Sequence, residues 1–204
     1  MKFNTPNKLT IFRIVLIPFF MVFLLYNIFG GEKEIWCRII SAAIFIIASV
    51  TDFLDGYLAR KNGQVTNFGK FMDPLADKFL VFGAIIAILA SDFAIYDGSI
   101  ISQEILRQAF LWSGIVVIFR ELAVTSMRLV VNNTSGIVVS ANMLGKIKTN
   151  TQIVCVCCVI LEPILLPFCG NLISFISCIV MTVFTIWSGL SYLKAYWPYI
   201  KSDS

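Results

Sequence analysis

Six long apolar stretches divide the chain, and shorter polar segments separate them. A helix needs about 20 predominantly apolar residues to cross the hydrocarbon core of a bilayer. Each stretch is close to that length, so the pattern predicts six membrane-spanning helices. They cover approximately residues 9–29, 35–58, 74–91, 105–131, 149–168 and 170–192. The predicted fold class is therefore an all-α polytopic membrane protein, with residues 1–204 forming a single transmembrane domain.

The composition supports a membrane location. Hydrophobic residues make up 58% of the chain and charged residues 14%, and the mean hydropathy is +0.86, whereas soluble domains carry about 45–50% apolar residues. Lysine and arginine gather in both terminal segments and after the second and fourth spans, so the positive-inside rule places these segments on the cytoplasmic side. The net charge of +4 reflects these basic cytoplasmic segments. Because no basic patch is interleaved with aromatic residues, the charge does not indicate nucleic-acid binding.

The segment from residue 52 to residue 77 interrupts the apolar pattern with aspartates and small residues. In a helix, residues spaced i, i+3, i+4 and i+7 lie on one face. One such face joins Asp52, Asp55, Gly56 and Ala59. A second face, spaced i, i+4 and i+8, joins Gly69, Asp73 and Asp77. A short basic turn lets the two faces converge on one point, and Pro74 places the start of the third span near Asp73.

Four carboxylates at one point repel one another, so a cation has to lie among them. Carboxylate oxygens suit hard divalent cations such as magnesium, manganese or calcium, and the chain contains no histidine for a zinc site of the usual kind. The sequence therefore predicts a divalent-metal site. Its predicted ligands are Asp52, Asp55, Asp73 and Asp77. The alternative is a set of solvated carboxylates paired with Arg60, Lys61, Lys70 and Lys78.

Basic residues also occur in and beside the later spans. Arg120 and Arg128 are eight residues apart near one face of the fourth span, and Lys146 and Lys148 lie where the fifth begins. An arginine inside a span costs about 2.5–3.5 kcal/mol, so Arg120 needs a polar cavity or a partner such as an aspartate. Anchoring at the membrane surface is the alternative for the two lysines.

The last two spans carry no obvious chemistry. Cysteines lie mostly within apolar spans and, without histidine or a second C-x-x-C, are predicted to be core residues rather than metal ligands or disulfides. They are Cys37, Cys155, Cys157, Cys158, Cys169 and Cys178. The aromatic residues near the end of the chain are predicted to form a belt at the membrane surface. They are Trp187, Tyr192, Tyr196 and Trp197.

The aspartate segment contains the complete pattern D-x2-D-G-x2-A-R-x8-G-x3-D-x3-D, which resembles the signature of the CDP-alcohol phosphotransferase family. The resemblance implies a membrane enzyme that uses a hydroxyl nucleophile to displace CMP from a CDP-linked lipid or alcohol. It implies two divalent metals, Mg²⁺ or Mn²⁺, on the four aspartates, with Asp77 also accepting the alcohol proton. It further implies CDP binding by Gly56, Ala59, Arg60 and Gly69.

Three further motifs resemble the branch of this family that makes phosphatidylglycerophosphate in bacteria. They are P-N-x-L-T-x-x-R-x-x-x-I-P, R-E-x-x-x-T-x-x-R and A-x-x-x-G-K-x-K-T-x-x-Q. This resemblance implies transfer of a phosphatidyl group from CDP-diacylglycerol to sn-glycerol 3-phosphate, by a homodimer in the bacterial plasma membrane. The acceptor phosphate would be bound by Arg120, Arg128, Lys146 and Lys148. Asn7, Thr10 and Arg13 would line the mouth of the polar cavity.

Two alternative functions remain open from the residues. The first is a family member with another acceptor, such as inositol phosphate, serine or phosphatidylglycerol; the basic residues favour an anionic acceptor over serine. The second is a small membrane transporter. A transporter would need polar residues that continue across the bilayer, and spans five and six lack them. It would also need matching broken helices in the two halves of the chain, and the sequence does not show these.

Overall fold

The computed structural model describes residues 5–26, 28, 34–61, 67–91, 95, 97–135 and 143–201. Within these ranges, side chains are described except at residues 5, 6, 55–61, 67, 68, 70, 132–135 and 199–201. The long helices are α1 (Thr5–Leu25), α2 (Glu34–Lys61), α3 (Asn67–Ala90), α4 (Gln103–Ser135), α5 (Met143–Leu165) and α6 (Leu172–Lys201). A short 3-10 helix, η2 (Pro167–Cys169), links α5 to α6. The all-α prediction with six long helices is confirmed over the described residues.

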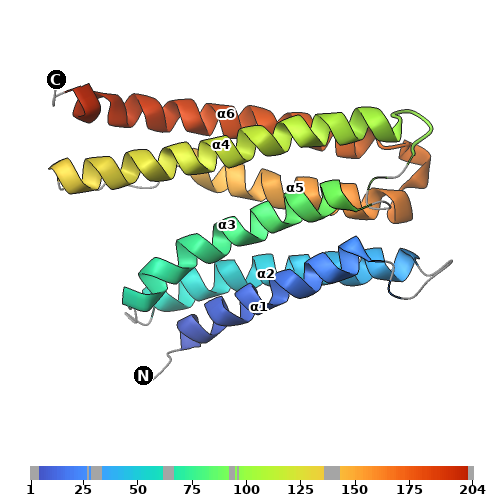
Figure 1. The fold of residues 1–204 in the computed structure, drawn as a ribbon, viewed down its shortest axis with the longest axis horizontal. Helices are drawn as coiled ribbons and strands as arrows, with labels where there is room; N and C mark the ends of the chain where they lie inside the picture. Colours follow the sequence, from blue (N-terminus) through green and yellow to red (C-terminus); the bar gives the residue numbers. More distant parts are fainter. Residues whose placement is uncertain are drawn as a thin grey trace.

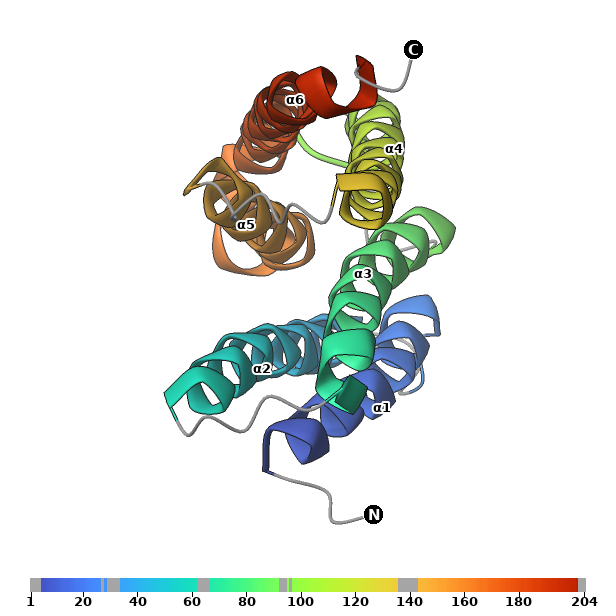
Figure 2. The ribbon, with the colours of Figure 1, turned by 90° about the vertical axis from the view of Figure 1, so that its left-hand side faces the viewer.

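Two groups of three helices lie side by side and run nearly the whole length of the molecule (Figure 1). Seen end-on, α1, α2 and α3 form one group, and α4, α5 and α6 form the other (Figure 2). Contacts of α2 with α5, and of α3 with α4 and α5, join the groups. Because α1 begins and α6 ends at the same end of the bundle, we call this the terminal end.

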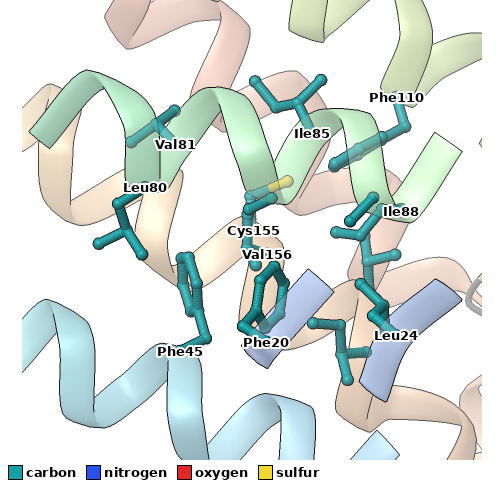
Figure 3. Packing of buried hydrophobic residues seen from close by; sticks show 14 of the residues in the cluster. Phe20, Leu24, Phe45, Leu80, Val81, Ile85, Ile88, Phe110, Cys155 and Val156 are labelled. Carbon is teal, nitrogen blue, oxygen red and sulfur yellow. The ribbon is translucent and has the colours of Figure 1, made fainter. Parts of the chain in front are cut away.

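Apolar side chains from all six helices fill the space between the helices. Phe20 of α1 packs against Phe45 of α2, with ring centroids 5.5 Å apart. Figure 3 shows the same region with Leu80, Ile85 and Ile88 of α3 and with side chains of α4 and α5. Cys178 and Met181 of α6 complete this core. The interhelical packing thus holds the polar residues of several helices in fixed positions.

The outer faces of the bundle are apolar, which is what contact with lipid requires. Among the described residues, four helices are long and apolar enough to cross a membrane: 7–25, 34–54, 143–165 and 172–198. The other two helices, α3 and α4, carry Asp73 and Asp77 and the buried Arg120–Glu121 pair. The chain is therefore a polytopic membrane protein.

The predicted start of the third helix near Asp73 is wrong. The helix α3 begins at Asn67, so Pro74 lies inside it. Asp73 consequently does not cap a helix, and its carboxylate accepts a hydrogen bond from α1 instead.

Glu162 closes the connection between α5 and α6 at the end opposite the terminal end. Its carboxylate is buried and accepts hydrogen bonds from the backbone N–H groups of Ile173, at 3.2 Å, and Ser174, at 2.6 Å. These donors belong to the first turn of α6, where backbone N–H groups lack helical partners and a negative charge is favoured. Glu162 therefore has a structural role.

The prediction that the cysteines are core residues is confirmed for three of the six, whereas Cys157, Cys158 and Cys169 are partly exposed. All six are free thiols, and Cys37, Cys155 and Cys178 are buried in the packing between helices. The sulfurs of Cys155 and Cys178 lie 3.7 Å apart across the α5–α6 contact.

Candidate active site

The helices α2 and α3 bring three of the four predicted aspartates, Asp52, Asp73 and Asp77, within electrostatic range of one another. Asp73 and Asp77 lie one turn apart on α3, so they share a face as the spacing predicts. Asp52 of α2 interacts electrostatically with both of them. All three carboxylates are partly buried. Like charges confined in this way repel one another, and they require nearby positive charge or hydrogen-bond donors.

The helix α1 supplies both kinds of partner. Thr10 donates a hydrogen bond to Oδ1 of Asp73 at 2.8 Å, and Nη1 of Arg13 forms an ion pair with Oδ1 of Asp52. Thr10 and Arg13 are buried on one face of α1, together with Asn7. These three residues were expected at a cavity mouth on resemblance alone. The structure places two of them in direct contact with the aspartates.

Removing the carboxylate of Asp52 is expected to destabilise the fold. Arg13 is fully buried, whereas the Asp52 side chain is 35% exposed. An Asp52→Ala variant leaves a buried guanidinium without this partner, so we expect a loss at the lower end of about 3–5 kcal/mol. Denaturant titration in detergent micelles measures this loss. The double variant Arg13→Met/Asp52→Ala should recover much of it, and equal losses in the single and double variants would contradict the ion-pair explanation.

The carboxylate oxygens of this cluster are the donor type that magnesium and manganese prefer. No group of three or more His, Cys, Asp or Glu side chains is close enough to hold a metal ion in the part of the chain whose side chains are described. The fourth predicted ligand, Asp55, has an undescribed side chain, as do the predicted CDP-binding residues Gly56, Ala59 and Arg60. Gly69 is buried one turn before Asp73. The carboxylates present match a hard divalent cation in donor type, and the described side chains alone do not complete a site for one.

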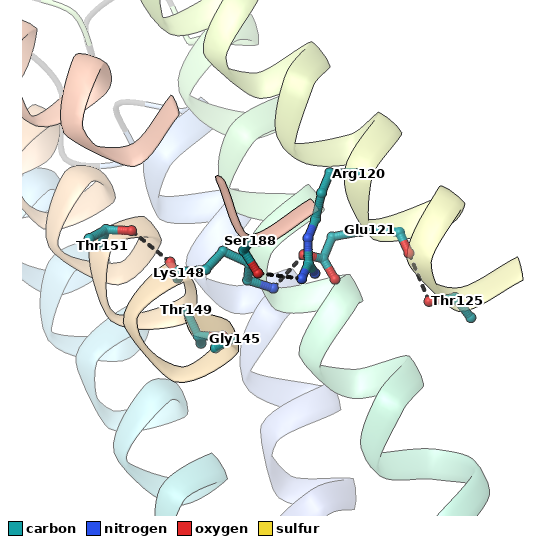
Figure 4. A network of polar contacts seen from close by, with 8 residues as sticks. All are labelled: Arg120, Glu121, Thr125, Gly145, Lys148, Thr149, Thr151 and Ser188. Carbon is teal, nitrogen blue, oxygen red and sulfur yellow. Dashed lines mark hydrogen bonds and ion pairs between the residues drawn. The ribbon is translucent and has the colours of Figure 1, made fainter. Parts of the chain in front are cut away.

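A second cluster of charges joins α4, α5 and α6. Glu121 of α4 accepts from Nη1 of Arg120, at 3.0 Å, and forms an ion pair with Nζ of Lys148 on α5. Nη2 of Arg120 donates to Oγ of Ser188 on α6 at 2.7 Å. Figure 4 shows these four side chains converging from the three helices. All four residues are buried, with at most 9% of each residue exposed, so the cluster holds two cations and one anion away from water.

Two residues of α6 shape the surroundings of Arg120. The guanidinium lies over the ring of Tyr192, with its carbon 5.3 Å from the ring centroid, which is a favourable cation–π distance. Gly189 has no side chain, and a Cβ there would lie 3.1 Å from Cγ of Arg120. The small residue therefore lets α6 approach the arginine closely.

The two clusters belong to one site because Asp77 interacts with both. Its carboxylate interacts electrostatically with Asp52 and Arg13 of the first cluster and with Lys148 and Glu121 of the second. A carboxylate on α3 thus interacts with a basic group of α5 and an acidic group of α4 across the junction between the two helix groups. Such a site can bind an anion beside a cluster of carboxylates.

Sequence reasoning identified part of the second cluster. It singled out Arg120 and Lys148, which the structure places together in this cluster, and their role as ligands of the acceptor phosphate stays a prediction. The alternative of an aspartate partner for Arg120 is not what the structure has, because the partner is Glu121. Arg128 and Lys146, expected to share the acceptor site, have exposed side chains and take no part in the described ion-pair cluster.

Ser188 and Tyr192 were missed as site residues. The aromatic-belt prediction is wrong for Tyr192 and Tyr196, which are buried against α4, whereas Trp187 and Trp197 are exposed as expected. A usable signal was present: Ser188 and Tyr192 are one turn apart in α6, which places a hydroxyl and a ring on one face.

Comparison with known proteins identifies relatives over almost the whole chain. The family model described as CDP-alcohol phosphatidyltransferase matches residues 3–187. A CDP-diacylglycerol–glycerol-3-phosphate 3-phosphatidyltransferase of Bacillus subtilis is 43% identical, with 99% of this chain and 100% of the relative aligned. Proteins of the same name from Salmonella typhimurium and Escherichia coli K12 are 36% and 35% identical, with 96% of each chain aligned.

Proposed function

Since this chain belongs to the CDP-alcohol phosphatidyltransferase family, we propose that it transfers a phosphatidyl group from CDP-diacylglycerol to sn-glycerol 3-phosphate. The products are phosphatidylglycerophosphate and CMP, so the reaction is a step of phospholipid biosynthesis. The names of the aligned relatives support this choice of substrates. The structural observation that carries the proposal is the pairing of two charge clusters of opposite net sign, which are close enough for Asp77 of one to interact electrostatically with Lys148 of the other.

The reaction requires one substrate hydroxyl and one pyrophosphate. The 1-hydroxyl oxygen of glycerol 3-phosphate forms a bond to the phosphorus that carries diacylglycerol, and the bond from that phosphorus to the bridging oxygen breaks. CMP leaves with the bridging oxygen. We assign Asp77 as the group that accepts the hydroxyl proton, because it is the described carboxylate that faces both clusters.

Arg120 and Lys148 would bind the phosphate of the acceptor. A guanidinium presents a planar set of donors that suits phosphate oxygens, and an ammonium adds a point charge. Both side chains are buried, so their attraction for an anion is weakly screened. The reaction also requires recognition of the CDP group. In this proposal, the CDP group is bound by Gly56, Ala59, Arg60 and Gly69.

Magnesium or manganese ions would be held by Asp52, Asp55, Asp73 and Asp77. When bound, such ions neutralise charge on the pyrophosphate and stabilise the departing CMP. Arg13 contacts the carboxylate of Asp52, and Thr10 contacts that of Asp73. These contacts would hold the two carboxylates in position for the metal ions. We also propose that the protein is a homodimer in the bacterial plasma membrane, with the terminal end on the cytoplasmic side, as the distribution of basic residues favours.

The direct test is CMP release from CDP-diacylglycerol by purified protein in detergent micelles. We expect release with glycerol 3-phosphate and either Mg²⁺ or Mn²⁺, loss of release with EDTA, and no comparable release with inositol phosphate, serine or phosphatidylglycerol. Strong release with another acceptor would leave the reaction class standing and overturn the acceptor. No release with any acceptor in folded protein would overturn the transferase proposal.

A further inference from the structure

Polar side chains in the second helix group form three successive levels along α5 and α6. The first level is the cluster of Arg120, Lys148 and Ser188, whose members are joined by ion pairs and hydrogen bonds. The third level lies about two turns farther from the terminal end, where Thr182 of α6 donates to Oγ of Ser113 on α4 at 2.8 Å. Both levels therefore have internal partners.

The middle level contains Gln152 of α5 and Thr185 of α6. Gln152 lies four residues after Lys148, and Thr185 lies three residues before Ser188, so each is one helical turn deeper than a member of the charged cluster. Because α5 and α6 pack against each other, the two residues occupy the same level. Gln152 is 2% exposed and Thr185 is fully buried.

The middle level differs from its neighbours because its polar atoms lack partners. Nε2 of Gln152 and Oγ1 of Thr185 are buried without a hydrogen-bond partner among the described residues, and so is Nε of Arg120 in the charged cluster. Leaving buried donors unpaired costs free energy. Two donors one turn below the cluster and one donor within it, from three helices, are therefore available to a ligand.

We propose that Gln152 and Thr185 form the inner wall of the acceptor site and donate hydrogen bonds to the phosphate of a small phosphomonoester. This inference rests on the proposed function, because it extends the acceptor site by one turn. A phosphomonoester has three terminal oxygens that each accept several hydrogen bonds. Arg120 and Lys148 supply the charge, while the amide and the hydroxyl supply neutral donors that orient the phosphate.

The test compares the wild-type protein with Gln152→Met and Thr185→Val, which remove the donors and keep most of the side-chain volume. We expect the KM for glycerol 3-phosphate to rise about tenfold or more and the KM for CDP-diacylglycerol to stay within about twofold. In the absence of glycerol 3-phosphate, the unfolding temperature of each variant in detergent should equal or exceed that of the wild type, because an unpaired buried polar group has been removed. The stabilisation of the wild type by glycerol 3-phosphate should shrink in both variants.

Thr182→Val is the matched control, because it makes the same chemical change one turn away, where the hydroxyl already has a partner. It should lower the unfolding temperature and leave the KM for glycerol 3-phosphate unchanged. An unchanged KM in both Gln152→Met and Thr185→Val would overturn the inference and assign the middle level to bound water. Wild-type protein that neither binds glycerol 3-phosphate nor releases CMP with it would overturn the proposed function itself.

Discussion

Replacing Asp77 with asparagine is expected to reduce CMP release by about 100- to 10,000-fold, the range in which a positioned general base contributes. Asparagine has nearly the same shape, so the packing of α3 should persist. The change removes the negative charge that faces Lys148 and Arg13, and it removes the oxygen that we assign to accept the hydroxyl proton. The measurement is the turnover number at saturating CDP-diacylglycerol and glycerol 3-phosphate.

Asp97→Asn is a suitable control for this variant. The Asp97 side chain is exposed, and its Oδ1 accepts a hydrogen bond from the backbone N–H of Gln103 at 3.0 Å, at the start of α4. Asparagine can make the same capping bond, so the control should keep full turnover. An Asp77→Asn protein that retained more than about a tenth of wild-type turnover would show that Asp77 is not the proton acceptor.

The second large effect is expected from Lys148→Met. This change removes the buried ammonium but keeps an apolar chain in its place. We expect the KM for glycerol 3-phosphate to rise roughly 10- to 100-fold, which corresponds to losing a hydrogen bond to a charged group. The KM for CDP-diacylglycerol should change little. Steady-state kinetics with each substrate varied in turn separates the two constants.

Lys146→Met provides a sharp comparison for this variant. Both lysines match the same motif, but the Lys146 side chain is exposed while Lys148 is buried against Glu121. If burial in the cluster decides acceptor binding, Lys146→Met should change the KM for glycerol 3-phosphate by no more than about twofold. Equal effects of the two substitutions would mean that the ion-pair cluster does not define the acceptor site.

Stability offers an independent check on Lys148. Without its ammonium, the buried Glu121 carboxylate keeps only Arg120 as an ionic partner in the described cluster, so Lys148→Met should also destabilise the fold. Adding Glu121→Gln should lower stability further, because the buried Arg120 guanidinium then loses its carboxylate partner. It should not restore the KM, because the phosphate-binding ammonium is still missing. A change in stability without a matching change in the KM separates a binding role of Lys148 from a purely structural one.

Much of the fold and part of the site follow from the sequence alone. The lengths of the apolar stretches determine six long helices, because the width of the hydrocarbon core sets the length of a spanning helix. Helical spacing places Asp73 and Asp77 on one face of α3, and the signature around them identifies the reaction class. The cost of a charge at membrane depth was enough to single out Arg120 as a residue that needs a partner.

Only the tertiary structure determined which helix faces contact one another. Thr10 reaches Asp73 across 63 positions of sequence, Lys148 reaches Glu121 across 27, and Arg120 reaches Ser188 across 68. Helical periodicity fixes the direction of a side chain around its own helix axis, but the rotation and crossing of neighbouring helices depend on how their side chains interdigitate. The partners of Asp52, Asp73 and Arg120, and the burial that separates Lys148 from Lys146, arise from that packing.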